Sequence, residues 1–342
     1  MKLVLHIGSG KTGTSSIQKK LKDSKKSGKL KSFIYTGLFF EEVPECDVDM
    51  SGRLPQHFFT EMRGRKEDEL IDLTLGCLQT IKSVYEKKGI DTIIWSNESL
   101  YRSTSFFANL IPLISPLFDL EVVLYLRRQD KWFVSSYEQW NIKHKTYSGK
   151  YKNFDEWFAS NSNRGSHEKN LITWEKMVGK QNFKVHAYDE IDNVVDHFLN
   201  SVDIKLTDSL QITNKSRVNT QQPKALLSIY ELYSSVSLNS QLPVEVNKLL
   251  QNIPVNQIEY ESATIKGLSD VNINAGILDV FEEENKRISE RYNIPFSKKY
   301  WDLEQINKTS GSASVESILA VMVRILVEQN NRITELESKL NN

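Results

Sequence analysis

Short apolar runs alternate with stretches of helical periodicity in the N-terminal part of the chain, and this alternation limits the folds open to it. The apolar runs are residues 3–7, 33–35, 92–95, 120–126 and 183–188. The helical stretches between them are residues 15–26, 67–88, 103–111, 132–143 and 169–178. Strands that are apolar on both faces are typical of parallel sheets covered by helices. The sequence therefore predicts an α/β fold with a central parallel sheet, which binds ligands at the carboxyl ends of its strands.

Composition excludes several classes of protein. Lysine plus arginine equals aspartate plus glutamate at 44 each, so nothing in the overall charge indicates a nucleic-acid partner. The two cysteines, Cys46 and Cys77, have no paired spacing that would indicate a disulfide framework or a zinc site. The first apolar run is too short for a signal peptide, and no run reaches the ~18 apolar residues of a membrane span. We expect a cytoplasmic protein without a membrane span.

The C-terminal part has a different pattern. From about residue 195 the chain turns mainly helical, and the segment 214–256 could either cover a cleft or pack on the sheet. A Ser/Gly segment at 309–314 reads as a linker. In the stretch Val315–Leu340, residues spaced alternately by four and three form a heptad seam. The seam predicts either a coiled coil that sets an oligomeric state or one amphipathic helix packed on its own domain. We expect one domain over 1–310 and a separate helix over 315–342.

A glycine-rich turn follows the first apolar run. Residues 6–18 read HIGSGKTGTSSIQ, with three glycines, five hydroxyl residues and Lys11 between a strand and a helix. Backbone N–H groups at such a turn point at an anion, and the helix dipole favours it. The end of the motif resembles a Walker A loop, but the required first glycine would fall on Leu5, inside the strand. No apolar run ends in the aspartate expected to hold Mg²⁺. A kinase or nucleotide hydrolase that uses Mg-ATP is therefore the second hypothesis.

The segment KTGTSS at residues 11–16 resembles the 5′-phosphosulfate loop of bacterial-type sulfotransferases that use 3′-phosphoadenosine 5′-phosphosulfate (PAPS). The resemblance implies a three-layer fold like that of P-loop NTPases, with a core over about residues 1–200 and a mainly helical region over 200–310. It also implies that Lys11 lies near the oxygen that bridges phosphate and sulfate. The hydroxyls and amides of residues 12–16 would hold the 5′-phosphate. The donor-binding residues that the resemblance implies in this loop are thus Lys11, Thr12, Gly13, Thr14, Ser15 and Ser16.

A second motif strengthens the resemblance. Residues 122–140, VVLYLRRQDKWFVSSYEQW, follow the strongest apolar run. In the family, an arginine just beyond a strand and a serine eight residues later bind the 3′-phosphate, and Arg128 with Ser136 match that spacing. A guanidinium suits a phosphate dianion because it donates two parallel hydrogen bonds. Arg127 is assigned a surface or structural role. The RKGxxG-type segment of cytosolic animal enzymes does not occur in this sequence.

The acceptor hydroxyl or amine needs a general base at a strand end. Glu98 comes three residues after Trp95, where related enzymes carry a His or Glu base. His6 is the competing candidate, although a histidine in a buried strand is more often a core residue. The lysines between residues 19 and 31 could attract an anionic acceptor or form a solvated face.

These observations predict a PAPS-dependent sulfotransferase with Lys11 and Glu98 as catalytic residues. It would need no metal, and adenosine 3′,5′-bisphosphate (PAP) would be its product. Analogy with bacterial relatives implies a carbohydrate or glycolipid acceptor. A catalytically inactive oligomeric scaffold remains a further alternative, beside the Mg-ATP enzyme.

Overall fold

The computed structural model describes residues 1–26, 33–48, 66–143, 145, 147, 152–204, 271–301 and 315–340. The predicted segments 214–256 and 309–314 lie outside these residues, as do Lys29 and Lys31 of the lysine-rich stretch. The chain divides into two compact units. The first comprises Met1–Arg128, Ser166–Asn219 and Glu284–Ser297, and the second comprises Gln129–Gly165, Thr220–Glu283 and Lys298–Asn342.

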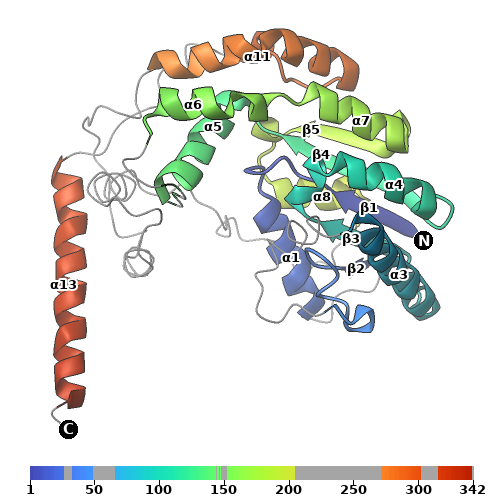
Figure 1. The fold of residues 1–342 in the computed structure, drawn as a ribbon, viewed down its shortest axis with the longest axis horizontal. Helices are drawn as coiled ribbons and strands as arrows, with labels where there is room; N and C mark the ends of the chain where they lie inside the picture. The colour runs from blue at the N-terminus through green and yellow to red at the C-terminus, as the bar shows by residue number, and fades with distance from the viewer. Residues whose placement is uncertain are drawn as a thin grey trace. The chain divides into compact units, whose positions relative to one another are not determined.

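The first unit contains a five-stranded, all-parallel sheet with helices on both faces (Figure 1), so the predicted α/β fold is confirmed. The strand order is β2-β3-β1-β4-β5. The strands are β1 Lys2–His6, β2 Phe33–Tyr35, β3 Thr92–Ser96, β4 Asp119–Leu126 and β5 Phe183–Ala187. The helices of this unit are α1 Thr14–Lys26, α3 Glu67–Tyr85, α4 Thr104–Ile114, α7 Glu168–Val178, α8 Val194–Ser201 and the end of α11, Val271–Tyr292.

Side chains that alternate along each strand separate two hydrophobic layers. On β1, Leu3 and Leu5 pack into one cluster with α3, α4, α7 and the end of α11. Val4 points the other way, into a cluster with α1 and α8. All of these β1 side chains are fully buried, which explains why the strands of this sheet are apolar on both faces.

Strand β1 marks the point where the sheet changes its winding. The helix that follows β1, α1, packs on one face, whereas the helix that follows the neighbouring strand β3, α4, packs on the opposite face. In open α/β sheets, ligands bind outside the carboxyl ends of the strands at such a point. The turn after β1 is therefore the place where this topology favours a binding site.

The described residues of the second unit are largely helical. Helices α5 Gln129–Tyr137 and α6 Phe154–Asn161, the π-helix η4 Glu138–Lys143 and the first part of α11 belong to it. Phe133 stands at the centre of an aromatic cluster with Trp157, Phe158 and Phe281, at ring-centroid distances of 4.8–6.1 Å. The C-terminal helix α13, Val315–Leu340, also belongs to this unit. No helix among the described residues is long and apolar enough to cross a membrane.

Candidate functional site

The turn after β1 adopts left-handed backbone conformations, which are energetically unfavourable for residues other than glycine. Gly10, Lys11 and Gly13 all have positive φ values, of 77°, 59° and 75°. Glycine takes such values freely, but a lysine does so uncommonly, and strain of this kind concentrates at binding sites. Successive backbone N–H groups in a turn of this type form a concavity that binds anions. The positive φ values are typical of such a turn, and anion binding by it stays a prediction.

Two glycines of the turn are required by close packing. A Cβ atom at Gly8 would lie 2.6 Å from Thr14 Oγ1, at the start of α1. A Cβ at Gly13 would lie 2.6 Å from Val194 Cγ1, at the start of α8. Any larger residue at either position would move the turn away from the helix it contacts.

The hydroxyl residues of the turn differ in exposure. Thr12 and Thr14 are buried, and their Oγ1 atoms lie 3.5 Å apart. Ser15 is exposed and Ser16 is half-buried, and the Ser16 N–H donates to the Gly13 carbonyl at 2.9 Å to close the first turn of α1. Of the hydroxyls predicted to hold the 5′-phosphate, Ser15 and Ser16 are thus the more accessible pair.

Arg127 contacts the turn from the end of β4. Its Nη1 donates to the Lys11 carbonyl oxygen at 3.2 Å, and its guanidinium lies 5.8 Å from the centre of the Tyr188 ring. The hydrogen bond holds the one non-glycine residue of the turn that has positive φ. Sequence reasoning assigned Arg127 only a surface or structural role, because a contact between residues 116 positions apart has no local signal.

Glu98 lies at the carboxyl end of β3, next to the turn. A Cβ at Gly10 would be 3.8 Å from Glu98 Oε2, so the carboxylate faces the turn. Partial removal of the carboxylate from water raises the pKa of Glu98, while the positive charge of Lys11 lowers it by a smaller amount. Part of the side chain is exposed, and solvent therefore screens both effects. The two predicted catalytic residues, Lys11 and Glu98, therefore lie close enough for the charge of one to act on the other.

Asn97 fixes the backbone that carries Glu98. Its N–H donates to the His6 carbonyl at 3.1 Å, and its Nδ2 donates to the Leu38 carbonyl at 3.0 Å. Its Oδ1 accepts from the Ser99 N–H at 2.8 Å and thereby caps the 3₁₀ helix η3, Glu98–Arg102. Asparagine at the start of a helical turn is a recognised sequence signal, and it could have drawn attention to this residue.

His6 occupies a different environment from Glu98. Its ring is fully buried between Tyr125 and Phe198, and its Nδ1 lies 2.7 Å from Ser96 Oγ. Burial lowers the pKa of His6 to about 3, so the ring is neutral near pH 7. A side chain without solvent access on the α1 and α8 face cannot reach an acceptor at the strand ends. The structure therefore favours Glu98 over His6 as the candidate base.

The two residues predicted to bind a 3′-phosphate belong to different units. Arg128 ends the first segment of the first unit, is buried, and has its backbone N–H bonded to Asp189 Oδ2 at 2.7 Å. Ser136 lies on α5 in the second unit and is also buried, and its Oγ has no hydrogen-bond partner in the described part of the chain. Their joint role remains a prediction.

A separate cavity of about 390 Å³ lies at the carboxyl end of β5. His186 and His197 line it, with ring centroids 4.6 Å apart, and the Tyr125 hydroxyl lies 3.0 Å from His197 Nδ1. Burial is the largest cause that lowers the pKa of both histidines, to about 4 for His186. Among the residues that the structure describes, no group of three or more His, Cys, Asp or Glu side chains could hold a metal ion.

Comparison with known proteins adds no assignment. No protein-family profile matches the sequence, and no curated protein matches it.

Proposed function

We propose that the protein is a PAPS-dependent sulfotransferase that transfers a sulfuryl group to a hydroxyl or amine of a carbohydrate or glycolipid acceptor. The main support is the arrangement at the end of β1, where a turn with positive φ values that carries Lys11 faces the carboxylate of Glu98. The resemblance of residues 11–16 and 122–140 to two motifs of that family makes the assignment more specific than a general nucleotide site.

Each residue of the site has a role in the proposed transfer. Backbone N–H groups of the turn and the start of α1, with the Ser15 and Ser16 hydroxyls, would hold the 5′-phosphate of the donor. Lys11 would stabilise the negative charge that builds on the bridging oxygen as the bond from sulfur to that oxygen breaks. A new bond forms between sulfur and the acceptor oxygen or nitrogen, and Glu98 would take the proton that this atom loses. The products are the sulfated acceptor and PAP.

The electrostatics of Glu98 fit this role. A raised pKa makes the carboxylate a stronger base than an ordinary surface glutamate, and the nearby Lys11 helps keep it ionised. A sulfuryl group carries less negative charge than a phosphoryl group, so a lysine and backbone dipoles can stabilise its transfer without a divalent cation.

The role of Arg128 can be tested by comparing two nucleotides that differ only in the 3′-phosphate. We expect the wild-type protein to bind PAP more tightly than adenosine 5′-monophosphate in calorimetry. Arg128→Ala should weaken PAP binding by about 1.5–3 kcal/mol, roughly tenfold to 150-fold, and leave binding of the monophosphate nearly unchanged. Arg287→Ala, which removes an exposed arginine on α11, is the matched control.

Three outcomes would contradict the proposal. Equal affinity of the wild-type protein for the two nucleotides would remove the case for a 3′-phosphate site. Tight binding of Mg-ATP that is indifferent to Arg128 would support the kinase or hydrolase instead. If PAP binds but no acceptor in a broad glycan panel is sulfated, the inactive scaffold becomes the better description.

A further inference from the structure

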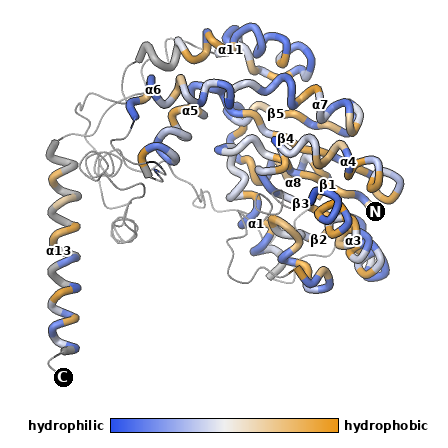
Figure 2. The backbone as a smooth tube through the Cα atoms, in the orientation of Figure 1, coloured by the Kyte–Doolittle hydropathy of each residue, from blue (hydrophilic) through white to orange (hydrophobic). Residues whose placement is uncertain are grey.

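Helix α13, Val315–Leu340, presents apolar side chains along a continuous seam. With heptad positions lettered a to g, the seam residues fall alternately at d and a from Val315 to Leu340. Five of them are large apolar side chains that are 43–66% exposed and follow one another along the same helix face, and contiguous exposed apolar surface of this kind marks interaction sites. Figure 2 shows hydrophobic and hydrophilic positions recurring along this helix. The exposed seam residues are Leu319, Met322, Leu326, Ile333 and Leu336.

A seam of this length and spacing fits a specific kind of partner. Leucine and isoleucine at successive a positions insert as knobs between the side chains of a second helix with the same repeat. A second copy of this chain supplies that repeat in register. Gln329 is half-buried and stands at the one polar d position of the seam. It would meet its own counterpart only when the two helices are parallel and aligned, since other registers place it against an apolar residue.

The charges beside the seam complement a parallel pair. Arg332 occupies a g position and Glu337 occupies the e position five residues later, which are the two positions that meet across a parallel coiled coil. Both side chains are exposed, and neither has an ion-pair partner within the part of the chain that the structure describes. Lys339, at the next g position, instead pairs with Glu335 of its own helix at 2.5 Å. An antiparallel pair would bring g positions together, and Arg332 and Lys339 carry the same charge.

We infer that α13 is a self-association element that joins this chain to a second copy in a parallel, in-register coiled coil. Arg332 of each copy pairs with Glu337 of the other, and the Gln329 layer fixes the register. The inference rests on α13 alone and does not depend on the proposed enzymatic activity.

Sedimentation equilibrium of the full chain tests the inference. We expect the measured mass to rise with protein concentration and to reach at least twice the 39.5 kDa of one chain. The series should extend to about 100 μM, which is a hundredfold above a Kd of about 1 μM. Leu326→Glu should abolish the association, because it places a charge in the seam. Ser338→Glu introduces the same residue at an f position on the outer face and should leave the mass unchanged. A wild-type monomer over the whole range, or association that survives Leu326→Glu, would overturn the inference.

A charge exchange tests the parallel register. Arg332→Glu alone and Glu337→Arg alone each replace two attractive pairs by repulsive ones, and each should raise Kd by roughly twofold to thirtyfold. The double variant Arg332→Glu/Glu337→Arg restores both attractive pairs and should recover the wild-type affinity. An equimolar mixture of the two single variants should also associate more tightly than either one alone. If neither the double variant nor the mixture recovers affinity, the helices do not pair in this register.

Discussion

At the candidate site, the states that the proposed function requires of Glu98 and Lys11 are unfavourable for the stability of the fold. Glu98 pays a desolvation cost when it is ionised, as its raised pKa indicates, yet the proposed proton transfer requires the ionised form. Lys11 is held in a left-handed conformation that Arg127 stabilises through the Lys11 carbonyl. Strain and desolvation at the same strand end are expected where a fold gives up stability for function.

Glu98→Gln should separate binding from turnover. The amide keeps the shape of the side chain but cannot accept the acceptor proton, so sulfuryl transfer should fall by roughly a hundredfold or more while PAP affinity changes little. Wild-type activity should rise as the pH increases through the raised pKa of Glu98, because only the ionised carboxylate can act as the base. The variant should lack this dependence on the acid side of the rate–pH profile, its acid limb. Rate–pH profiles with calorimetry of PAP check both effects, and an unchanged acid limb in the variant would assign the base elsewhere.

The same substitution has an expected effect on stability with a definite sign. A group whose pKa is raised by folding favours the folded state when protonated and loses that contribution as pH rises through the folded pKa. At pH 7 the ionised Glu98 therefore costs stability, and Glu98→Gln should raise the melting temperature. The difference should shrink as pH falls, because wild-type Glu98 becomes protonated. A variant that melts lower than wild type at pH 7 would contradict the pKa direction.

Arg127→Ala tests whether the turn must be held in place. Loss of the contact to the Lys11 carbonyl should weaken PAP binding by about 1–2 kcal/mol, roughly fivefold to thirtyfold. Arg127→Lys should recover part of this loss, because a lysine can donate to the same carbonyl but cannot reproduce the planar contact with Tyr188. Equal PAP affinity in wild type and Arg127→Ala, measured by calorimetry, would show that the turn keeps its shape alone.

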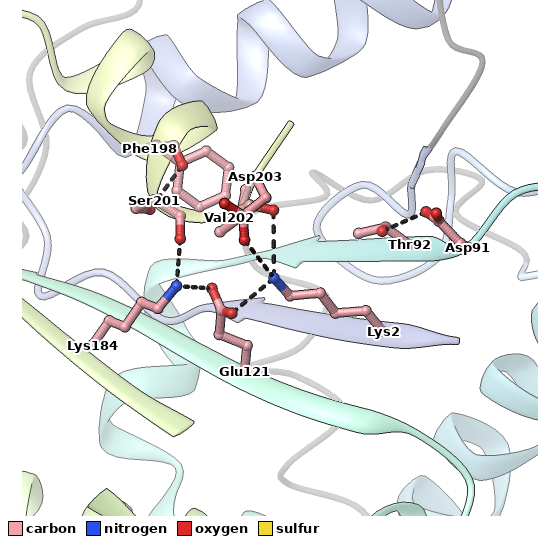
Figure 3. Close-up of polar contacts among 9 residues, drawn as sticks. All are labelled: Lys2, Asp91, Thr92, Glu121, Lys184, Phe198, Ser201, Val202 and Asp203. Atoms are coloured by element: carbon pink, nitrogen blue, oxygen red, sulfur yellow. Dashed lines mark hydrogen bonds and ion pairs between the residues drawn. The ribbon is translucent and has the colours of Figure 1, made fainter. Parts of the chain in front are cut away.

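At the scale of secondary-structure elements, a group of charges fixes α8 to the sheet. Glu121 on β4 lies between Lys2 on β1 and Lys184 on β5, with Nζ–O distances of 2.8 and 2.9 Å (Figure 3). The lysines also donate to carbonyls at the end of α8, of Val202 and Ser201 respectively. The opposite end of α8 packs against the turn at Gly13, so this network holds the helix that supports the site.

Removal of the central charge should destabilise the first unit. Glu121→Ala leaves two partly buried lysines without their carboxylate, and the free energy of unfolding should fall by about 1–3 kcal/mol. Glu69→Ala is the control, because it breaks an exposed pair with Lys66 at 3.7 Å and should change stability by less than about 0.5 kcal/mol. Chemical denaturation measures both, and equal effects of the two variants would show that the network contributes no more than a surface pair.

The elements of the sheet could be predicted because each strand carries its own local signal. All five predicted apolar runs are strands, and every strand end lies within one residue of the predicted end. The prediction for α4 was too short: it stopped before Pro112, whereas the helix includes this proline and continues to the buried Ile114. Burial of that last turn compensates the backbone hydrogen bond that proline cannot make. Helix α6 was not predicted, although Asn153 and Glu156 form a capping box at its start.

The site was less predictable than the sheet. The positions of Lys11 and Glu98 follow from strand ends, which the sequence indicates directly. The supports of the site, Arg127 and Asn97, depend on contacts with residues far away in the sequence, and only the packed fold brings those residues together.

The whole molecule should lose stability on mild acidification. Burial lowers the pKa of His6 and of His167 to about 3, and that of His186 to about 4, well below the ordinary value of histidine. A lowered histidine pKa gives stability that is present above the unfolded pKa and is lost as pH falls toward the folded one. At pH 5.5 each fully buried histidine should cost about 1.4 kcal/mol relative to pH 7.5 or above.

Chemical denaturation at pH 7.5 and pH 5.5 measures this loss. His167→Gln should reduce the difference between the two pH values by about 1.4 kcal/mol, whatever its effect at pH 7.5. A pH dependence that is identical in wild type and variant would mean that His167 is protonated in the folded protein.

The measurement that tests the proposed sulfotransferase most directly is calorimetric binding of PAP to the wild-type full chain in the presence of a metal chelator, beside Mg-ATP binding in its absence. We expect PAP to bind without metal and Mg-ATP to bind weakly. Tight binding of Mg-ATP with no measurable binding of PAP would contradict the proposal and assign the turn at Lys11 to a nucleoside triphosphate instead.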